Sequence, residues 1–332
     1  MADDATETDA RTNADAAASF GPHSVSWRVL TAPATALMIA QITNLLEIPH
    51  LDFQAALFDH DPLFPTNKKR QRGSRGAGRR KDGHFHDRLR RTLSVPLPMV
   101  FGDNEAAWSC ATRLFNYHRP MTGVGADGRT PYSATSPESM LFAAVTISHA
   151  ALIAYERFAF DGRRPPRRLD QSERDQYFAE MSQIAVMMGV PAEDVPMSAT
   201  EVDQYYRSIS AKFGTRPGWE SARLRTAAAL LLPDSWSDVV ATTNDVLLVL
   251  STLVSYAALP KPSRRLHRLP AITDPALSLT RLATLPLFAL LQVPAVERAV
   301  LRWYLGEADR AVLVEARRQI QSASAESLRA VS

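Results

Sequence analysis

The sequence is poor in cysteine, with Cys110 as the single example among 332 residues. One cysteine excludes an intramolecular disulfide and any metal cage built from cysteines alone. Residues 1–9 are acidic and polar, and they show neither the cationic start nor the apolar stretch of a secretory signal peptide. We therefore expect a cytoplasmic protein.

Long apolar runs are also scarce. The longest, residues 246–259 and 282–293, fall short of the roughly 20 residues that span a bilayer. We expect no transmembrane helix and interpret both runs as buried helices. Contact of apolar helices such as 283–293 with a membrane surface is an alternative, and it would make the protein membrane-associated.

Positive charge is concentrated in one segment, although the net charge is only +3 at pH 7. Between Lys68 and Arg91 there are 11 basic residues and only two acidic ones, so the rest of the chain is net acidic. The part at 66–83 is rich in Gly and Arg and has no aromatic residue or apolar face, which predicts a mobile surface loop.

The chain divides into a tail and one domain. Residues 1–25 are rich in Ala, Asp, Thr and Asn without apolar periodicity, which predicts a disordered tail. Structure should begin near Trp27. Residues 26–322 should form a single large domain that carries the basic loop at 66–83 as an insertion.

Helix signals recur along this domain. Ser136, followed by Pro137 and Glu138, is typical of a helix start, and we expect that helix to run to about residue 160. The segments 170–173 and 198–201 fit the capping-box pattern, and Gly189 with Pro191 should end a helix between them. Strand alternation is hard to find and no repeat is visible, so we predict an all-α fold.

An apolar stripe with helical spacing ends at His118. It comprises Trp108, Ala111 and Phe115, and it predicts that the His118 imidazole faces the interior. Periodicity alone favours a buried histidine that is hydrogen-bonded to backbone. Axial ligation of a haem iron is the alternative that implies function.

A second cluster comprises Arg88, Arg91 and Thr92, whose spacings of three and four place them on one face of a helix. Such a face can direct two cations and a hydroxyl into one space, which suits an oxygen-derived ligand. Without further context, a solvated face continuing the basic loop is the favoured interpretation.

Two other patterns are weaker. His84 with His86, and Asp59–Asp61, have metal-binding residue types, but they flank a cationic loop and lack a third well-spaced ligand. The glycines at 123–128 follow no expected strand, so an ordinary turn is favoured over a phosphate-binding loop.

Several short motifs in order resemble one family. They are Asp61-Pro-Leu, Arg88-Leu-Arg-Arg-Thr-Leu, Val100-Phe-Gly-Asp, His118 with Gly123 and Asp127-Gly, Tyr132-Ser-Ala, Ser136-Pro-Glu, Leu169-Asp-Gln-Ser-Glu-Arg, Tyr177-Phe-Ala-Glu, Met188-Gly-Val-Pro and Val195-Pro-Met-Ser-Ala-Thr-Glu. No single motif is specific, but their order and spacing from about Val29 to Gly306 resemble the MpaB and rubber-oxygenase (latex clearing protein) catalytic-domain family.

This resemblance implies a globin-like helical core with extra helices, a haem b cofactor, and oxidative cleavage of C=C bonds in an apolar, isoprenoid or lipid-like substrate by O2. His118 matches the proximal iron ligand. Arg88 and Thr92 match pocket residues that would donate hydrogen bonds to dioxygen. Arg91 stands where rubber-cleaving members carry lysine, and its permanently protonated guanidinium cannot ligate iron.

Two departures from the family pattern concern histidines. Asn44 replaces the histidine of a Gln-Ile-Ala-His-Pro motif, and Ala144 replaces the histidine of a Trp-Val-His-Ala-Thr motif. His149 lies roughly 140° further around a helix from Ala144, so it cannot simply substitute. These changes imply altered or lost chemistry.

A different class of function is a non-catalytic helical protein whose arginine loop binds an acidic partner, a membrane surface or nucleic acid. Such a loop binds phosphates through charge, but it lacks the interleaved aromatic residues of base recognition, which argues against nucleic acid as the partner.

Overall fold

The computed structural model describes residues 21–61, 90, 92, 96–125, 128–215, 247 and 251–331. Its named elements are α2 (Val25–Thr31), α3 (Pro33–Glu47), α4 (Leu51–His60), α7 (Pro96–Phe101), α8 (Asn104–His118), β1 (Thr122–Val124), β2 (Pro131–Ser133), α9 (Pro137–Phe158), α10 (Gln171–Met187), η1 (Ala192–Asp194), α11 (Ala199–Ser208), η2 (Ser210–Lys212), α14 (Lys261–Leu266), η4 (Ala271–Thr273), α15 (Asp274–Ala289), η5 (Leu290–Gln292), α16 (Pro294–Leu305) and α17 (Glu307–Val331). The predicted all-α single domain is confirmed.

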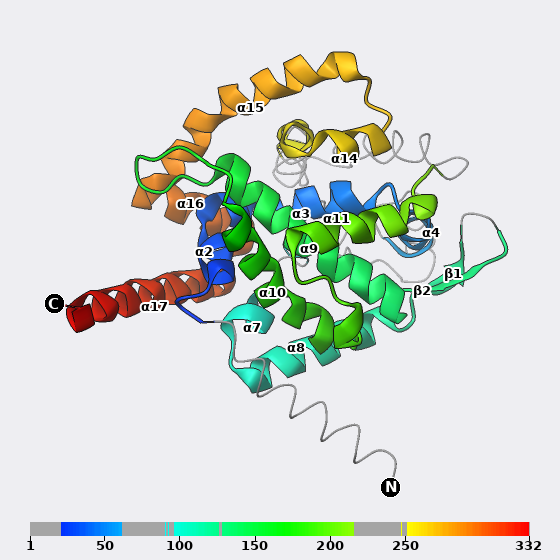
Figure 1. Cartoon of the computed structure of the whole chain (residues 1–332), viewed down its shortest axis with the longest axis horizontal. Coiled ribbons are helices and arrows are strands. Elements are labelled where there is room, and N and C mark those ends of the chain that lie inside the picture. Colours follow the sequence, from blue (N-terminus) through cyan, green and yellow to red (C-terminus); the bar gives the residue numbers. More distant parts are fainter. Residues whose placement is uncertain are drawn as a thin grey trace, which may run out of the picture.

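Helix α9 is the centre of the fold (Figure 1). It contacts α3, α10 and α2, and it contributes the buried side chains of Phe142, Leu152 and Phe158 to the core. Tyr177 of α10 is fully buried and donates a hydrogen bond to the carbonyl of Ser148 at 2.7 Å, which holds α10 to α9. This arrangement buries α9 along most of its length.

Local capping signals explain where several helices begin. The Ser136 side chain accepts a hydrogen bond from the amide of Ser139, and α9 ends at Phe158, close to the expected position. Asp170 and Glu173 form the predicted capping box of α10. Ser198 caps α11, but Glu201 accepts from the amide of Met197 instead of Ser198, so that box is only half formed.

Glycine ends α10 as predicted. Gly189 has φ of 86°, and the amides of Gly189 and Val190 donate to the carbonyls of Val186 and Ala185. This pair of bonds is a Schellman motif, and the left-handed residue within it favours glycine.

The domain boundaries differ in detail from the sequence-based ones. Ser24 caps α2, which begins at Val25, two residues before Trp27. Helix α17 continues to Val331, past the expected end at residue 322. Residues 1–20 of the expected tail and the whole basic insertion at 66–83 lie outside the described residues.

A small antiparallel hairpin follows α8. Strand β1 pairs with β2 in the register Gly123 to Tyr132, and the Tyr132 hydroxyl donates to Asp59 Oδ2 at 3.0 Å. Gly123 of the glycine-rich stretch therefore lies in β1, and Gly128, between the two strands, adopts φ of 70°. The sequence did not predict these two strands, because each has only three residues.

Among the described residues, α9 alone is by itself long and apolar enough to cross a membrane, and two bent helix pairs would also qualify if each were one span. This corrects the expectation that apolar stretches are too short, which considered only 246–259 and 282–293. However, 67% of the most apolar window of α9 is buried inside the protein, so the protein core covers most of the apolar surface that a membrane would otherwise cover.

Candidate functional site

His118 is the last residue of α8. At the start of this helix, the Asp103 side chain accepts a hydrogen bond from the amide of Ala106 at 2.8 Å, which satisfies a free donor of the first turn. Pro120 follows soon after the last turn, where proline is common because it cannot continue a helix. The chain then enters β1, so His118 lies at the corner between α8 and the hairpin.

The His118 imidazole is held by its own helix. Nδ1 lies 3.0 Å from the carbonyl oxygen of Leu114, and because a carbonyl can only accept, Nδ1 carries the proton and donates it. Within the described part of the chain, Nε2 makes no hydrogen bond. The ring is therefore oriented, with the lone pair of Nε2 available.

Burial sets the protonation state of this ring. Desolvation lowers the pKa of His118, and the hydrogen bond to the Leu114 carbonyl offsets only part of that effect. The neutral imidazole is therefore the dominant form at neutral pH. Neutral imidazole is also the form that ligates metals.

The predicted apolar stripe of α8 is wrong in part. Its buried side consists of small residues, Ala107, Cys110 and Ala111, where α8 contacts α7 and α10. Trp108 and Phe115 are 36% and 40% exposed. His118 lies on the same face at the end of the helix, where it is half-buried. The periodicity argument assumed that the large apolar side chains face the core. In the structure the small side chains do so, because they allow α8 to pack closely against its neighbours.

The arginine–threonine cluster lies largely outside the described residues, which exclude Arg88 and Arg91. Arg90 and Thr92 are helical, and Thr92 is half-buried. The guanidinium of Arg90 occupies the space that a Cβ at Gly306 would need, at the corner between α16 and α17. That the two arginines, Thr92 and His118 share one space stays a prediction.

Gln41 of the first divergent motif has a structural role. It is 3% exposed, and its amide exchanges hydrogen bonds with Ser251 at 2.6 and 2.8 Å and accepts one from Ser255 at 3.2 Å. These bonds join α3 to the helical residues 251–258. Asn44, three residues further on, is half-buried.

Ala144 of the second divergent motif is buried and helps to line a small apolar cavity between α9, α10 and α11. His149, five residues further along α9, lies with Nδ1 3.3 Å from the Tyr206 hydroxyl. Burial, with a smaller contribution from Arg174, lowers the pKa of His149 to about 4. The structure thus pairs His149 with α11.

Asp59 and His60 brace the hairpin. Asp59 accepts from the Tyr132 hydroxyl, and His60 Nε2 donates to the carbonyl of Thr122 at 3.2 Å. The described residues contain no group of three or more His, Cys, Asp or Glu side chains arranged to hold a metal ion. His84 and His86 lie outside this part of the chain.

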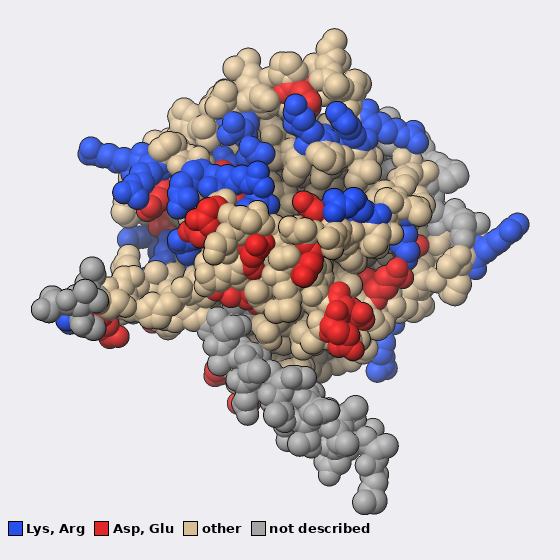
Figure 2. Space-filling model, in the orientation of Figure 1, with Lys and Arg blue, Asp and Glu red and all other residues tan. Residues whose placement is uncertain are grey.

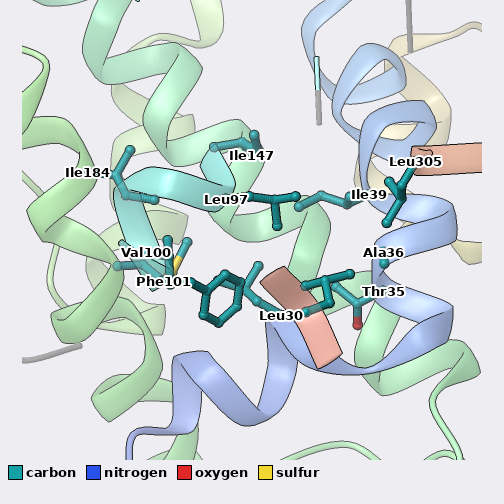
Figure 3. Close-up of a pocket in the computed structure, with 12 residues that line it drawn as sticks. Leu30, Thr35, Ala36, Ile39, Leu97, Val100, Phe101, Ile147, Ile184 and Leu305 are labelled. Carbon is teal, nitrogen blue, oxygen red and sulfur yellow. The ribbon is translucent and has the colours of Figure 1, made fainter. Parts of the chain in front are cut away.

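An apolar cavity of about 30 Å³ lies between α2, α3, α7, α9 and α10, closed by leucines of α16 and α17 (Figure 3). Its lining includes Leu97, Phe101 and Ile147, and the single hydroxyl residue among the lining is Thr35. Met181 is the one lining residue whose side chain can ligate iron, and no histidine, cysteine or tyrosine lines the cavity. A cavity of this size is a void of the core and is far too small for a haem.

Sequence reasoning did not identify His50, which is 4% exposed at the junction of α3 and α4. Its ring packs against Phe142 at 4.4 Å and near Phe53 and Phe213. Nδ1 is buried without a hydrogen-bond partner among the described residues, and burial lowers the pKa of His50 to about 4. Phe213 is distant in sequence, so no local pattern could reveal this environment.

Comparison with known proteins gives one match. The model of the family described as "ER-bound oxygenase mpaB/B'/Rubber oxygenase, catalytic domain" matches residues 27–288, from α2 almost to the end of α15. No curated protein and no solved structure matches the chain. A globin-like core consequently stays an expectation. The resemblance seen in the sequence is confirmed, and the chain belongs to the mpaB and rubber oxygenase catalytic-domain family.

Proposed function

We propose that this protein is a haem b-dependent oxygenase that oxidises an apolar, isoprenoid or lipid-like substrate with dioxygen. The family name states oxygenase activity for its relatives. The observation that carries the cofactor proposal is the imidazole of His118, which is neutral and oriented and has Nε2 available.

His118 would hold the iron through Nε2. The bond from Nδ1 to the Leu114 carbonyl fixes the tautomer and the ring orientation, as second-shell acceptors do for metal-bound histidines. When bound, haem b would supply the activation of dioxygen for oxidation of the substrate. Burial keeps His118 from taking up the proton that would compete with ligation.

Thr92 and Arg88 would donate hydrogen bonds to dioxygen and stabilise the negative charge that develops on it. At 100° per residue, Thr92 lies roughly 160° around the helix from Arg90. Since Arg90 is directed to Gly306, Thr92 points away from the α16–α17 corner. Arg91 would add positive charge without ligating iron.

The two positions where family motifs carry histidine supply no titrating group in this chain. Asn44 can donate or accept a hydrogen bond, and Ala144 can do neither. A proton required at either position must therefore come from water or another residue. This difference supports a reaction altered from that of the family's histidine-bearing members.

The test is the ultraviolet–visible spectrum of the protein expressed with a haem precursor, compared with His118→Ala. We expect a Soret band in the wild type that is lost or shifted in the variant, because the side chain that would hold the iron is removed. His60→Ala is the matched control, since His60 is also half-buried and also bonded to a backbone carbonyl.

A wild type that shows no Soret band after haem supplementation would refute the cofactor proposal. A Soret band that is lost in His60→Ala and kept in His118→Ala would assign iron ligation to His60 and not to His118. With the expected result, oxygen uptake and oxidation products are then measured with isoprenoid substrates, with Thr92→Val expected to lower turnover while leaving haem content intact.

A further inference from the structure

Helix α15 lies at the periphery of the molecule and arches over α14 (Figure 1). Only Leu277 and Phe288 are buried along its length. Phe288 stacks on Phe158 of α9 with ring centroids 4.3 Å apart, which attaches one end of α15 to the core. The remainder of the helix exposes a long side to the exterior.

The exposed side of α15 is apolar except for Ser278, which lies at its margin. The apolar residues are Pro275, Ala276, Leu279, Leu282, Ala283, Pro286 and Leu287, followed by Leu290 of η5, and at 100° per residue they fall within roughly 140° of the helix circumference. Leu279, Leu282 and Leu287 are 67%, 52% and 63% exposed. Ile272 before the helix and Val293 after η5 extend this surface.

An ordinary surface helix turns its apolar side to the core and its polar side to water, whereas α15 buries Leu277 and Phe288 and also exposes apolar residues on its outer side. The polar residues Arg281 and Thr284 lie instead on the half-buried side of α15. A contiguous exposed apolar surface of this kind marks an interaction site. We call Ile272–Val293 the apolar rim.

The charges that border the apolar rim are positive. Lys261, Arg265, Arg268 and Arg298 are exposed, and none forms an ion pair within the described part of the chain. The acidic residues of this region are neutralised, since Asp274 pairs with Arg264 at 3.3 Å and Glu297 pairs with Arg317. Figure 2 shows Lys and Arg side chains gathered beneath the tan surface at the top of the molecule, beside one smaller acidic patch.

We propose that the apolar rim is a docking surface for an anionic lipid bilayer. Helix α15 lies in the plane of the interface, its leucines enter the boundary of the acyl chains, and the flanking lysine and arginines contact anionic headgroups. This combination of an apolar face with adjacent basic residues is the chemistry of an interfacial helix. It stands on observations separate from those for haem binding.

Pro286 supports a position in the interface over one across the bilayer. Proline has no amide hydrogen, so the helical hydrogen bond to the carbonyl of Leu282 cannot form. Water and headgroups can satisfy that carbonyl at the interface, whereas the hydrocarbon interior offers no donor. The bend of 103° between residues 271–292 and α16 also brings the chain back toward the protein body.

Charge also argues against a second copy of this chain as the occupant. A two-fold symmetric dimer places the same surface on both sides of the interface. The unpaired cations around the apolar rim would then approach their own counterparts and repel them. An anionic bilayer removes this repulsion and covers the leucines at the same time.

The test is co-sedimentation with phosphatidylcholine vesicles that contain either no anionic lipid or roughly one third phosphatidylserine. Wild-type protein should bind the anionic vesicles much more tightly. The triple change Leu279→Ser, Leu282→Ser and Leu287→Ser should lower the partition coefficient by about ten-fold or more, since three exposed leucines no longer enter the acyl boundary. These exposed side chains leave the core unchanged.

Two further variants separate the contribution of the cationic residues from that of exposed apolar side chains in general. Arg265→Gln with Arg268→Gln should remove most of the preference for phosphatidylserine and leave weak binding to both vesicles. Val124→Ser with Met197→Ser, at exposed apolar positions elsewhere (47% and 49%), should bind as the wild type does. Haem content should be the same in all three, and His118→Ala should still bind vesicles.

Absence of wild-type binding to either vesicle would overturn the proposal. So would equal binding by the wild type and the triple leucine variant. Light scattering after size-exclusion chromatography tests the other occupant: a dimer that the leucine changes convert to a monomer, with no effect on vesicle binding, would assign the apolar rim to a second copy.

Discussion

At the scale of single residues, burial of imidazole changes the protonation of two histidines at acidic pH. His50 and His149 each have a pKa of about 4. In the unfolded chain the same groups titrate near 6.5. Between these values the unfolded state binds more protons than the folded state, so stability is present above pH 6.5 and is lost as the pH falls toward 4.

His50 tests this linkage best, because its Nδ1 is buried without a partner among the described residues. Its shift corresponds to at most about 3 kcal/mol between pH 7 and pH 4. The His50→Phe side chain can fill the same place in the aromatic cluster but does not titrate. Between pH 7 and pH 4 its free energy of unfolding should therefore fall by up to about 3 kcal/mol less than that of the wild type. Urea unfolding at several pH values measures it, with His23→Phe at an exposed position as the control. An unchanged pH slope in His50→Phe would contradict the assignment.

At the scale of elements, the Tyr177–Glu180 motif joins three helices. While Tyr177 binds α9, the Glu180 carboxylate of α10 accepts hydrogen bonds from the amides of Val25 and Ser26 at 3.2 and 2.7 Å. These are free donors in the first turn of α2, the helix that precedes α3. The motif therefore organises the entry of the chain into the core.

Removal of this contact should destabilise the fold. Glu180→Ala leaves two buried amides unpaired, and we expect a loss of about 2–4 kcal/mol in the free energy of unfolding. Glu180→Gln keeps a carbonyl acceptor and should lose about half as much. Urea denaturation followed by circular dichroism gives both values, and Glu193→Ala in η1 is an exposed acidic control. Equal stability of Glu180→Ala and Glu193→Ala would contradict this role.

The accuracy of sequence reasoning also differs by element. The caps at Ser136 and Asp170 and the glycine stop at Gly189 were predicted correctly, because each depends on a few neighbouring residues. The buried side of α8 was not predicted correctly, because it depends on which helices pack against α8. Similarly, the apolar stretch at 282–293 indicated a buried helix, yet most of that apolar surface is exposed.

At the scale of the whole molecule, the sequence predicted an all-α domain and its family, and both are confirmed. The sequence did not predict which distant segments lie next to each other in space. The aromatic surroundings of His50 combine residues from α4, α9 and position 213, and the α3 network of Gln41 depends on Ser251 and Ser255. Of the candidate site, the sequence identified His118, while its tautomer and lowered pKa required the structure.

The central claim is that His118 is the axial ligand, and ligand rescue tests it most directly. In His118→Gly, supplied with haem, imidazole added to the solution should enter the space left by the side chain and restore the wild-type Soret band. His60→Gly should show the wild-type spectrum with or without imidazole. A His118→Gly protein that folds, binds haem and already has the wild-type spectrum without imidazole would contradict the claim.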